Sequence, residues 1–310
     1  MKKTAILVSL FAIVILGGLF YIGWQRRGVN VSGQGVAVAA SFYPWAEFAR
    51  QVGGDLVRVT TVVPAGSEPH DYEPMPQEMA AVYDADIFIY NGSGIDPWAE
   101  RVAPDLRQKG VRVINMSDTV SLLSAPTVTG QPSEGQYDPH FWLDPVLVAK
   151  QIGVIRDALA AVDPAQAAVY GAQTDAYAAQ LAALDREYRS GLQSCALREI
   201  VTSHAAFGYL ARRYNLSVIN IAGLSPEEEP SARTLSDIAQ LARQKNIKYI
   251  FFETLVSPKL AQTVAAEIGA QTLVFNPLEG LTDAERQAGD SYISIMRDNL
   301  QNLRMALECQ

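Results

Sequence analysis

Histidine and cysteine, the side chains that bind transition metals most often, are scarce in this chain. Its 310 residues include three histidines and two cysteines. None of them forms the closely spaced helical His pair of a metalloprotease or the Cys-x-x-Cys pair of a structural zinc site. The chain also lacks a GxSxG motif and a phosphate-binding glycine loop. No short motif therefore indicates an enzyme.

Positive charge is in short supply as well. Lysine and arginine number 25 against 33 aspartate and glutamate residues, which leaves a formal net charge of −8. Four of the basic residues lie before residue 28, where there is no acid, so the rest of the chain is more negative still. Such an acidic chain repels nucleic acid and anionic lipid and weakly favours cations. We expect no nucleic-acid partner.

The longest uncharged stretch lies at the N-terminus. Residues 4–24 carry no charge and are mostly apolar, and basic pairs flank them at 2–3 and 26–27. Some twenty helical residues at about 1.5 Å each reach about 30 Å, the thickness of the hydrocarbon core of a bilayer. The stretch is therefore typical of a segment that enters a membrane.

Two interpretations of this stretch stay open, a cleaved signal peptide and an uncleaved single-span anchor. We favour the anchor, because the nearest small-residue cleavage pattern, at 37–39, lies inside the expected first strand. No cysteine follows the stretch, so a lipid-modified cysteine is excluded. We interpret 1–27 as a signal or uncleaved anchor and 28–35 as a flexible linker. The remainder is expected to be exported, either periplasmic or on the outer face of the cytoplasmic membrane, and anchored by residues 4–24.

The two cysteines suggest a disulfide bond in an exported chain. Cys195 and Cys309 each lie near an edge of the C-terminal half, so a bridge between them would fasten the last helix to that half. Two unpaired thiols are the alternative.

The body of the chain alternates short apolar runs with longer amphipathic stretches, a pattern typical of an α/β fold with mostly parallel strands. An apolar content of 49% and a charged content of 19% are those of a globular protein. Expected helices include 45–52, 232–245 and 259–268. Eight strands are expected, four in each half, at 36–40, 57–63, 87–90 and 111–115, and at 199–202, 218–221, 249–252 and 272–275.

A long helical block separates the two sets of strands. Asp144-Pro145 and Asp163-Pro164 both place a helix N-cap before a proline at the first helical position. From Pro164 to about Leu192 the chain is rich in alanine, glutamine, leucine and tyrosine and has two glycines, at 171 and 191. We predict two Rossmann-like lobes with parallel sheets, at 36–163 and 193–310, joined by one long helix at 164–192 and preceded by the N-terminal hydrophobic segment. So rigid a joint would restrict hinge motion.

The three histidines all lie in loops or at strand ends. They are His70 in GSEPHDYEP, His140 in YDPHFWLDP and His204 in VTSHAAFGYL. Two of them follow predicted strands, and the carboxyl ends of parallel strands form the crevice where ligands bind. Separations of 70 and 64 residues mean that the histidines come from distinct loops of both lobes. Three imidazoles suit zinc, so the pattern predicts a metal site between the lobes. For each histidine taken alone, a solvated loop residue is the alternative.

The same motifs resemble those of the metal-binding proteins of ABC importers for zinc and manganese, the ZnuA/TroA type. The similar segments occur in order from Val36 to the C-terminus: VAASFYPWAEFARQVGGD, PAGSEPHDYEP, NGSGIDPWAE, DPHFWLDP, TSHAAFGYLARRY, GLSPEEEPSARTL and GDSYISIMRDNL. The resemblance implies two α/β lobes joined by one long helix, and a carrier that delivers its ion to an ABC permease. We expect this carrier to be a monomer attached to the membrane through its N-terminal segment.

The resemblance also implies that His70, His140 and His204 are metal ligands. The family's fourth ligand is often an aspartate in a late strand-end loop, and in the matching stretch VFNPLEG that position holds Asn276. The fourth ligand therefore stays open among water, Glu68 and Asn276. We rank water or Glu68 first, because a neutral amide oxygen is a poorer zinc donor than a carboxylate.

Further acids lie near the expected cleft. Asp138 and Glu253 are candidates for carboxylates that orient a ligand histidine through its second ring nitrogen. A turn-shaping role for Asp138 and a plain strand-end acid for Glu253 are the alternatives. The run Glu227-Glu228-Glu229 is interpreted as a solvated loop, with attraction of cations at the cleft mouth as its second interpretation.

The types of donor favour zinc as the cargo. Imidazole suits zinc, whereas manganese prefers more carboxylate oxygen. The expected function is the capture of one Zn²⁺ per chain, with a manganese or iron carrier of the same type as the alternative. A three-histidine hydrolytic zinc enzyme is a further hypothesis, because three imidazoles and a zinc-bound water also suit catalysis.

Overall fold

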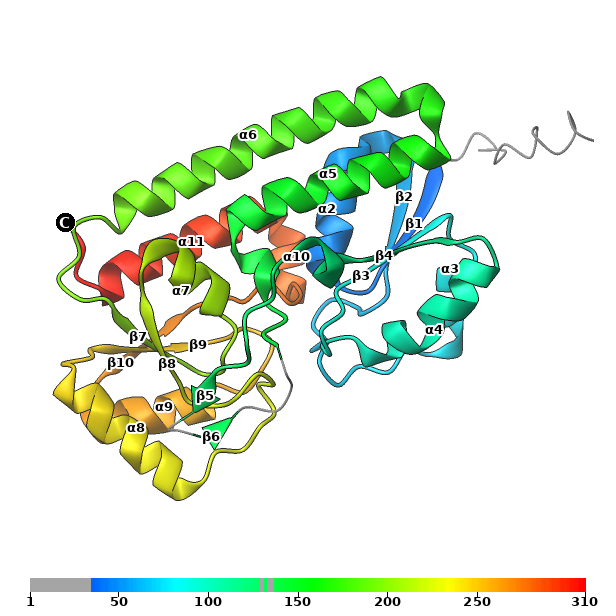
Figure 1. Cartoon of the computed structure of the whole chain (residues 1–310). Coiled ribbons are helices and arrows are strands. Elements are labelled where there is room, and N and C mark those ends of the chain that lie inside the picture. Colours follow the sequence, from blue (N-terminus) through cyan, green and yellow to red (C-terminus); the bar gives the residue numbers. More distant parts are fainter. Residues whose placement is uncertain (1–34, 129–130, 133–136) are drawn as a thin grey trace, which may run out of the picture. The chain divides into compact units, whose positions relative to one another are not determined.

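The computed structural model describes residues 35–128, 131–132 and 137–310, of which Val36–Gln310 form one unit (Figure 1). The predicted signal or anchor at 1–27 lies outside the described residues, as do 28–34 of the predicted linker and six residues between 128 and 137. Within the described ranges, no helix combines the length and the apolar character that crossing a bilayer requires.

Two four-stranded parallel sheets form the frame of the molecule. The first contains β1 (Val36–Ala40), β2 (Val57–Thr61), β3 (Ile87–Tyr90) and β4 (Arg112–Asn115) in the order β2-β1-β3-β4. The second contains β7 (Glu199–Thr202), β8 (Ser217–Asn220), β9 (Tyr249–Phe252) and β10 (Gln271–Val274) in the order β10-β9-β7-β8. Numbered along the chain within each lobe, both sheets have the same order, so the two lobes share one topology. All eight predicted strands are confirmed.

Helices cover both faces of each sheet. On one face, separate apolar clusters join the first sheet to α3 (Pro76–Tyr83) and α4 (Pro97–Gln108), and the second sheet to α8 (Ala232–Gln244) and α9 (Lys259–Ile268). The other faces meet a group of helices that Figure 1 shows along one side of both sheets: α2 (Tyr43–Gly53), α5 (Pro145–Val162), α6 (Ala167–Gly191) and α11 (Tyr292–Ala306). The smaller elements are α7 (Gly208–Tyr214), α10 (Asp283–Ala288), β5 (Thr127–Val128) and β6 (Gln131–Pro132).

The predicted linking helix is α6, which follows a 3-10 turn at Pro164–Gln166 and is about 37 Å long. Its buried residues recur at intervals of three and four, so one face of the helix packs against the rest of the protein: Tyr170, Thr174, Tyr177, Leu181, Leu184 and Tyr188. The helix before it, α5, begins at the predicted cap, where the Asp144 carboxylate accepts a hydrogen bond from Val146 N at 2.9 Å.

The two lobes share one apolar core. A single cluster of buried side chains includes Val38 of the first sheet, Phe251 of the second and Tyr177 of the linking helix. Hydrogen bonds cross the same region: Trp142 Nε1 donates to the carbonyl of Pro277 at 2.8 Å, and the Tyr292 hydroxyl donates to the carbonyl of Trp142 at 2.8 Å. The lobes are therefore joined by packing as well as by α6.

The cysteines form the predicted disulfide bond, Cys195–Cys309. Cys195 follows α6 and Cys309 follows α11, and Leu197 N donates to the carbonyl of Leu307 beside the bridge at 3.1 Å. The last helix is thereby fastened to the start of the second lobe.

Candidate metal centre

The histidines come from loops that the parallel sheets place at one end of their strands. His204 follows β7, and Glu253 follows β9, the strand beside it. Connections leave β7 and β9 in opposite directions along the sheet, and α/β folds bind ligands at such a reversal of strand order. His70 lies in the loop after β2, and His140 precedes the 3-10 turn Phe141–Leu143 that leads into α5.

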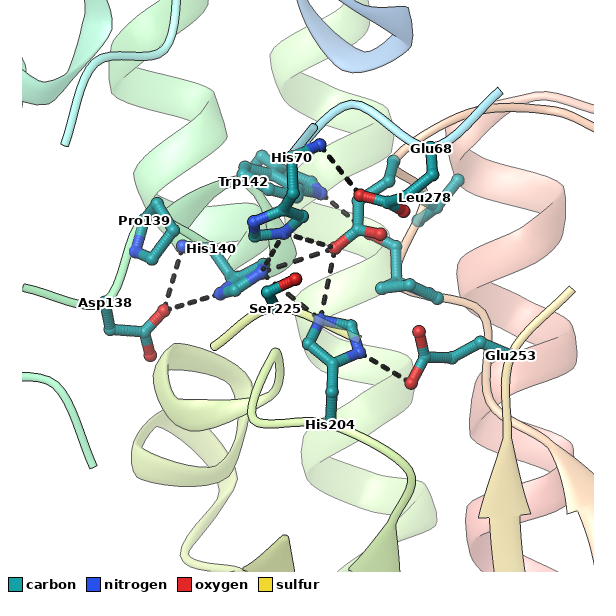
Figure 2. Close-up of polar contacts among 12 residues, drawn as sticks. Glu68, His70, Asp138, Pro139, His140, Trp142, His204, Ser225, Glu253 and Leu278 are labelled. Atoms are coloured by element: carbon teal, nitrogen blue, oxygen red, sulfur yellow. Dashed lines mark hydrogen bonds and ion pairs between the residues drawn. The ribbon is translucent and has the colours of Figure 1, made fainter. Parts of the chain in front are cut away.

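The structure brings four side chains of the described residues to one point: His70, His140, His204 and Glu279. Figure 2 shows the three imidazole rings turned toward one another. The Nε2 atom of His140 lies 3.3 Å from Nε2 of His70 and 3.4 Å from Nε2 of His204. Oε1 of Glu279 lies 3.3 Å from Nε2 of His140, 3.3 Å from Nε2 of His204 and 3.5 Å from Nε2 of His70.

Five of the six separations among the four donor atoms are close to those of the corners of a zinc tetrahedron, and the sixth, between Nε2 of His70 and Nε2 of His204, is within 4.8 Å. Bonds of about 2.0–2.1 Å from zinc to nitrogen or oxygen place neighbouring ligand atoms about 3.3–3.4 Å apart in tetrahedral geometry. Hydrogen bonding among the rings does not explain the arrangement, because each such contact needs one N–H and one lone pair, and three Nε2 atoms face the same point. The four donors are arranged for a cation.

Burial supports the same conclusion. The side chains of His140 and His204 are 0% exposed, that of Glu279 is 1% exposed and that of His70 is 8% exposed. Among the described residues, Oε1 of Glu279 has no hydrogen-bond donor. A buried carboxylate oxygen without a donor is costly unless it meets a positive charge. A divalent cation at the centre of the four atoms would supply that charge.

Two further carboxylates lie behind the rings, on the side away from the four-atom cluster (Figure 2). Oδ1 of Asp138 lies 2.8 Å from Nδ1 of His140. The same oxygen accepts a hydrogen bond from the backbone N–H of His140 at 2.9 Å. Oε1 of Glu253 lies 2.6 Å from Nδ1 of His204. A carboxylate at Nδ1 holds the proton on that nitrogen, so Nε2 keeps its lone pair for the metal.

Neutralising either carboxylate should weaken metal binding without removing a ligand. We expect Asp138→Asn and Glu253→Gln each to lower the affinity for Zn²⁺ about tenfold, at the lower end of the effect of such orienting groups. Competition against a chromophoric chelator measures the change, and the melting temperature of the metal-free variant serves as the control for folding. An affinity within about twofold of the unsubstituted protein would mean that the carboxylates do not set the imidazole tautomers.

Burial and the nearby carboxylates shift the pKa values of the ionisable groups in the site. Burial lowers the pKa of His70. Burial acts in the same direction on His140 and His204, but Asp138, Glu253 and Glu279 outweigh it and raise the pKa of both. Burial alone would raise the pKa of Glu279, yet the charge of His204 and the close approach of the three histidine rings hold it well below its usual range. Zinc binds neutral imidazole, so protons compete with the ion at these rings.

Glu279 owes its position to an unusual turn after β10. Leu278 has a φ of +59°, a left-handed conformation that residues with side chains seldom adopt. The side chain of Asn276 stabilises this turn: its Oδ1 accepts a hydrogen bond from Leu278 N at 2.7 Å, and its Nδ2 donates to Glu285 Oε1 at 2.8 Å. Both ends of the Asn276 amide are thus engaged in shaping the turn, and the predicted ligand Asn276 is not part of the four-atom cluster.

The other predicted fourth ligand, Glu68, lies beside the cluster but not in it. Its Oε1 accepts a hydrogen bond from His70 N at 2.8 Å, which fixes the loop that carries the histidine. Burial, and next the charge of Glu279, raise the pKa of Glu68 to about 10, so this carboxyl group is neutral near pH 7. A neutral acid that shapes the loop of His70 is a weaker metal donor than the ionised Glu279.

Glu279 is the member of the cluster that the sequence did not suggest. The stretch VFNPLEG holds both candidates, and Glu279 is the only acid between Thr272 and Leu281. This isolated acid after the last predicted strand was the available signal. The resemblance did not indicate Glu279, because the turn at the left-handed Leu278 brings to the cluster a side chain three residues beyond the matching position.

Comparison with known sequences identifies the family. The profile described as "ZnuA: Zinc-uptake complex component A periplasmic" matches residues 38–306. The chain is 38% identical over 282 residues to the zinc-binding lipoprotein AdcA of Streptococcus pneumoniae, a match that covers 87% of this chain and 56% of AdcA. It therefore spans only about half of AdcA. It is 37% identical over 289 residues to the high-affinity zinc uptake system protein ZnuA of Bacillus subtilis, with 91% of both chains covered.

Solved structures agree with this assignment. The crystal structure of the Zn(II)-bound ZnuA-like domain of Streptococcus pneumoniae AdcA matches 88% of this chain and 99% of that domain, with a TM-score of 0.77 at 38% identity. Sequence and fold together show that the chain belongs to the ZnuA family.

Proposed function

We propose that this protein binds one Zn²⁺ per chain as cargo through His70, His140, His204 and Glu279 and delivers it to an ABC permease. The observation that carries the proposal is the set of five separations of 3.3–3.5 Å among the four donor atoms. The names of AdcA and of the Bacillus ZnuA support zinc as the ion, since both describe zinc-binding or zinc-uptake proteins.

The donor set favours zinc over manganese or iron. Three imidazoles and one carboxylate in a closed tetrahedron suit zinc, which has no geometric preference from its d electrons. Manganese prefers oxygen-rich shells of higher coordination number, and its position in the Irving–Williams order makes it the weaker binder at a nitrogen-rich site. A manganese or iron carrier is therefore the second candidate.

The same geometry favours a carrier over an enzyme. Catalytic zinc has three protein ligands and keeps the fourth position for water or substrate. Here Glu279 Oε1 occupies the fourth corner and is 3.3 Å from Nε2 of both His140 and His204. A zinc ion in this shell would have no open position at which to activate a water molecule.

Location and lobe boundaries belong to the same proposal. The carrier acts outside the cytoplasm, as the word "periplasmic" in the family description and "lipoprotein" in the name of AdcA indicate for its relatives. The lobes at 36–163 and 193–310 contribute ligands from both sides, and 164–192 joins them. We expect the protein to act as a monomer, since the four proposed ligands complete the site without a second copy of the chain.

Competition between ions tests the proposal. Metal-stripped protein should bind one Zn²⁺ per chain, and Mn²⁺ should bind at least about 100-fold more weakly, because zinc lies far above manganese in affinity for nitrogen donors. Titration against a chromophoric chelator gives both constants, and elemental analysis of the protein as isolated gives the natural cargo. His204→Ala, which lacks one donor, is the control for specific binding. Tighter binding of Mn²⁺, or equal binding of Zn²⁺ by His204→Ala, would contradict the proposal.

A further inference from the structure

One cavity of the described residues is lined by a proposed ligand of the buried metal centre. Of the four proposed ligands, His70 is the most exposed, at 8%. It lines a cavity of about 240 Å³ together with residues of both lobes, among them Asp71, Ser93, Ser225 and Glu228. Two larger cavities, of about 340 and 410 Å³, contain none of the four ligands.

We propose that this cavity is the route by which Zn²⁺ enters and leaves, and that Glu228 serves in it as a transit ligand. A transit ligand replaces water on the incoming ion and hands the ion to His70, so it lowers the barrier in both directions. The inference rests on the proposed function, because it assigns a step of zinc binding to a residue outside the four ligands.

The size and lining of the cavity suit a partly hydrated cation. At about 30 Å³ per water molecule, the cavity holds about eight waters. None of the described lining residues is lysine or arginine. Apart from His70, the polar side chains of the lining carry oxygen: the carboxylates of Asp71 and Glu228 and the hydroxyls of Ser93, Tyr137 and Ser225. Oγ of Ser93 is buried without a hydrogen-bond partner among the described residues. Clefts lined by charge of one sign concentrate the opposite ion.

Glu228 is held at this cavity by its own turn. Its Oε1 accepts a hydrogen bond from Ser225 N at 3.3 Å, and its backbone N–H donates to the carbonyl of Ser225 at 3.3 Å. The carboxylate lies against Gly223, where a Cβ atom would come within 2.1 Å of Oε2. The carbonyl of Gly223 in turn accepts a hydrogen bond at 2.8 Å from Ala205, the residue after His204. The Glu228 carboxylate is thus anchored to the loop that carries a proposed ligand.

The acids on either side of Glu228 differ from it in exposure and in contact with the cavity. Glu227 and Glu229 are exposed and do not line the cavity, whereas Glu228 is half-buried within it. Within the described residues, Glu228 forms no ion pair with a basic side chain. The three consecutive glutamates therefore offer a matched comparison, because Glu228→Gln and Glu227→Gln change the net charge equally.

Stopped-flow kinetics on the full chain tests the inference. In Glu228→Gln, we expect the association rate of Zn²⁺ at low ionic strength and its release rate into excess chelator to fall together by about fivefold. This is less than the roughly 10-fold to 1000-fold effect of a whole charged cleft, because a single charge is removed. Kd should change less than about threefold, because none of the four ligands is altered. Glu227→Gln should keep the rates of the unsubstituted protein, and Glu228→Asp should recover part of the loss.

Other kinetic results would overturn either the transit role or the proposed function. Unchanged rates in Glu228→Gln, or an equal slowing in Glu227→Gln, would overturn the transit role. A Kd weakened tenfold at an unchanged association rate would place Glu228 in the bound state and would overturn it as well. If the unsubstituted protein binds no Zn²⁺, the proposed function fails, and that result is distinct from a failure of the transit role in a protein that binds zinc.

Discussion

Replacing Glu279 by glutamine should lower the affinity for Zn²⁺ at least about 100-fold. The substitution keeps the size of the side chain but removes the single negative charge among the four donors. Removing one partner of a buried charged pair costs about 3–5 kcal/mol, and each step of about 1.4 kcal/mol is tenfold in affinity. The side chain is 1% exposed, so water cannot compensate for the lost charge.

Glu68→Gln is the matched control for this prediction. Glu68 is a half-buried acid of the same size beside the same cluster, but its pKa, raised to about 10, favours its neutral form. An amide oxygen can still accept the hydrogen bond from His70 N. We therefore expect the affinity of Glu68→Gln to stay within about threefold of the unsubstituted protein, since neither charge nor a ligand is lost.

The two variants together decide the fourth ligand. X-ray absorption of the zinc-loaded protein should show three nitrogen donors and one oxygen donor at about 2.0 Å. If Glu68→Gln loses as much affinity as Glu279→Gln, both acids share the ion. If Glu279→Gln binds zinc normally, Glu279 is not a ligand, and water or Glu68 returns as the fourth donor.

Removing the disulfide bond should destabilise the protein by about 4 kcal/mol. Cys195 and Cys309 are 114 residues apart in sequence. A cross-link that closes a loop of about 100 residues restricts the unfolded chain by about 4.7 kcal/mol in the chain-entropy account, and measured values are often smaller. The double variant Cys195→Ser, Cys309→Ser should therefore have a lower free energy of unfolding, while its zinc site retains all four donors.

Urea denaturation of the metal-free protein measures this loss. The unsubstituted protein in a reducing agent should resemble the double variant, and the reducing agent should have no effect on the variant itself. Thiol counting under denaturing, non-reducing conditions should find no free thiol in the unsubstituted protein. Equal unfolding midpoints for the oxidised protein and the double variant would show that the bridge contributes nothing to stability.

Most of the fold could be predicted from sequence because its signals are local. Each strand is a short apolar run, and Asp144-Pro145 marks the start of α5 through a capping bond that forms within three residues. The face of α6 that packs is visible in the spacing of its buried residues. The shared core could not be predicted, since the contact of Trp142 with Pro277 and Tyr292 joins segments more than 130 residues apart.

The site was predictable in part for a similar reason. The three histidines are the only ones in the chain, and each stands in a recognisable motif. Glu279 is one of 33 acids, and only the backbone of Leu278 turns it toward the histidines. The sequence likewise does not show which of the three consecutive glutamates lines the cavity, because the fold of their loop decides this. In the structure it is Glu228, not Glu227 or Glu229.

The apolar core that runs from one sheet to the other has a consequence for how cargo is discharged. A carrier whose halves swing apart can empty itself through thermal motion, but here wide separation would expose buried side chains such as Phe251 and Tyr177 to water. The shared core that holds the four donors in place therefore also opposes release of the ion by opening of the two lobes. Release would instead pass through the cavity beside His70 and Glu228, so a receiving membrane protein would act on the loops around that cavity and not on the joint between the lobes.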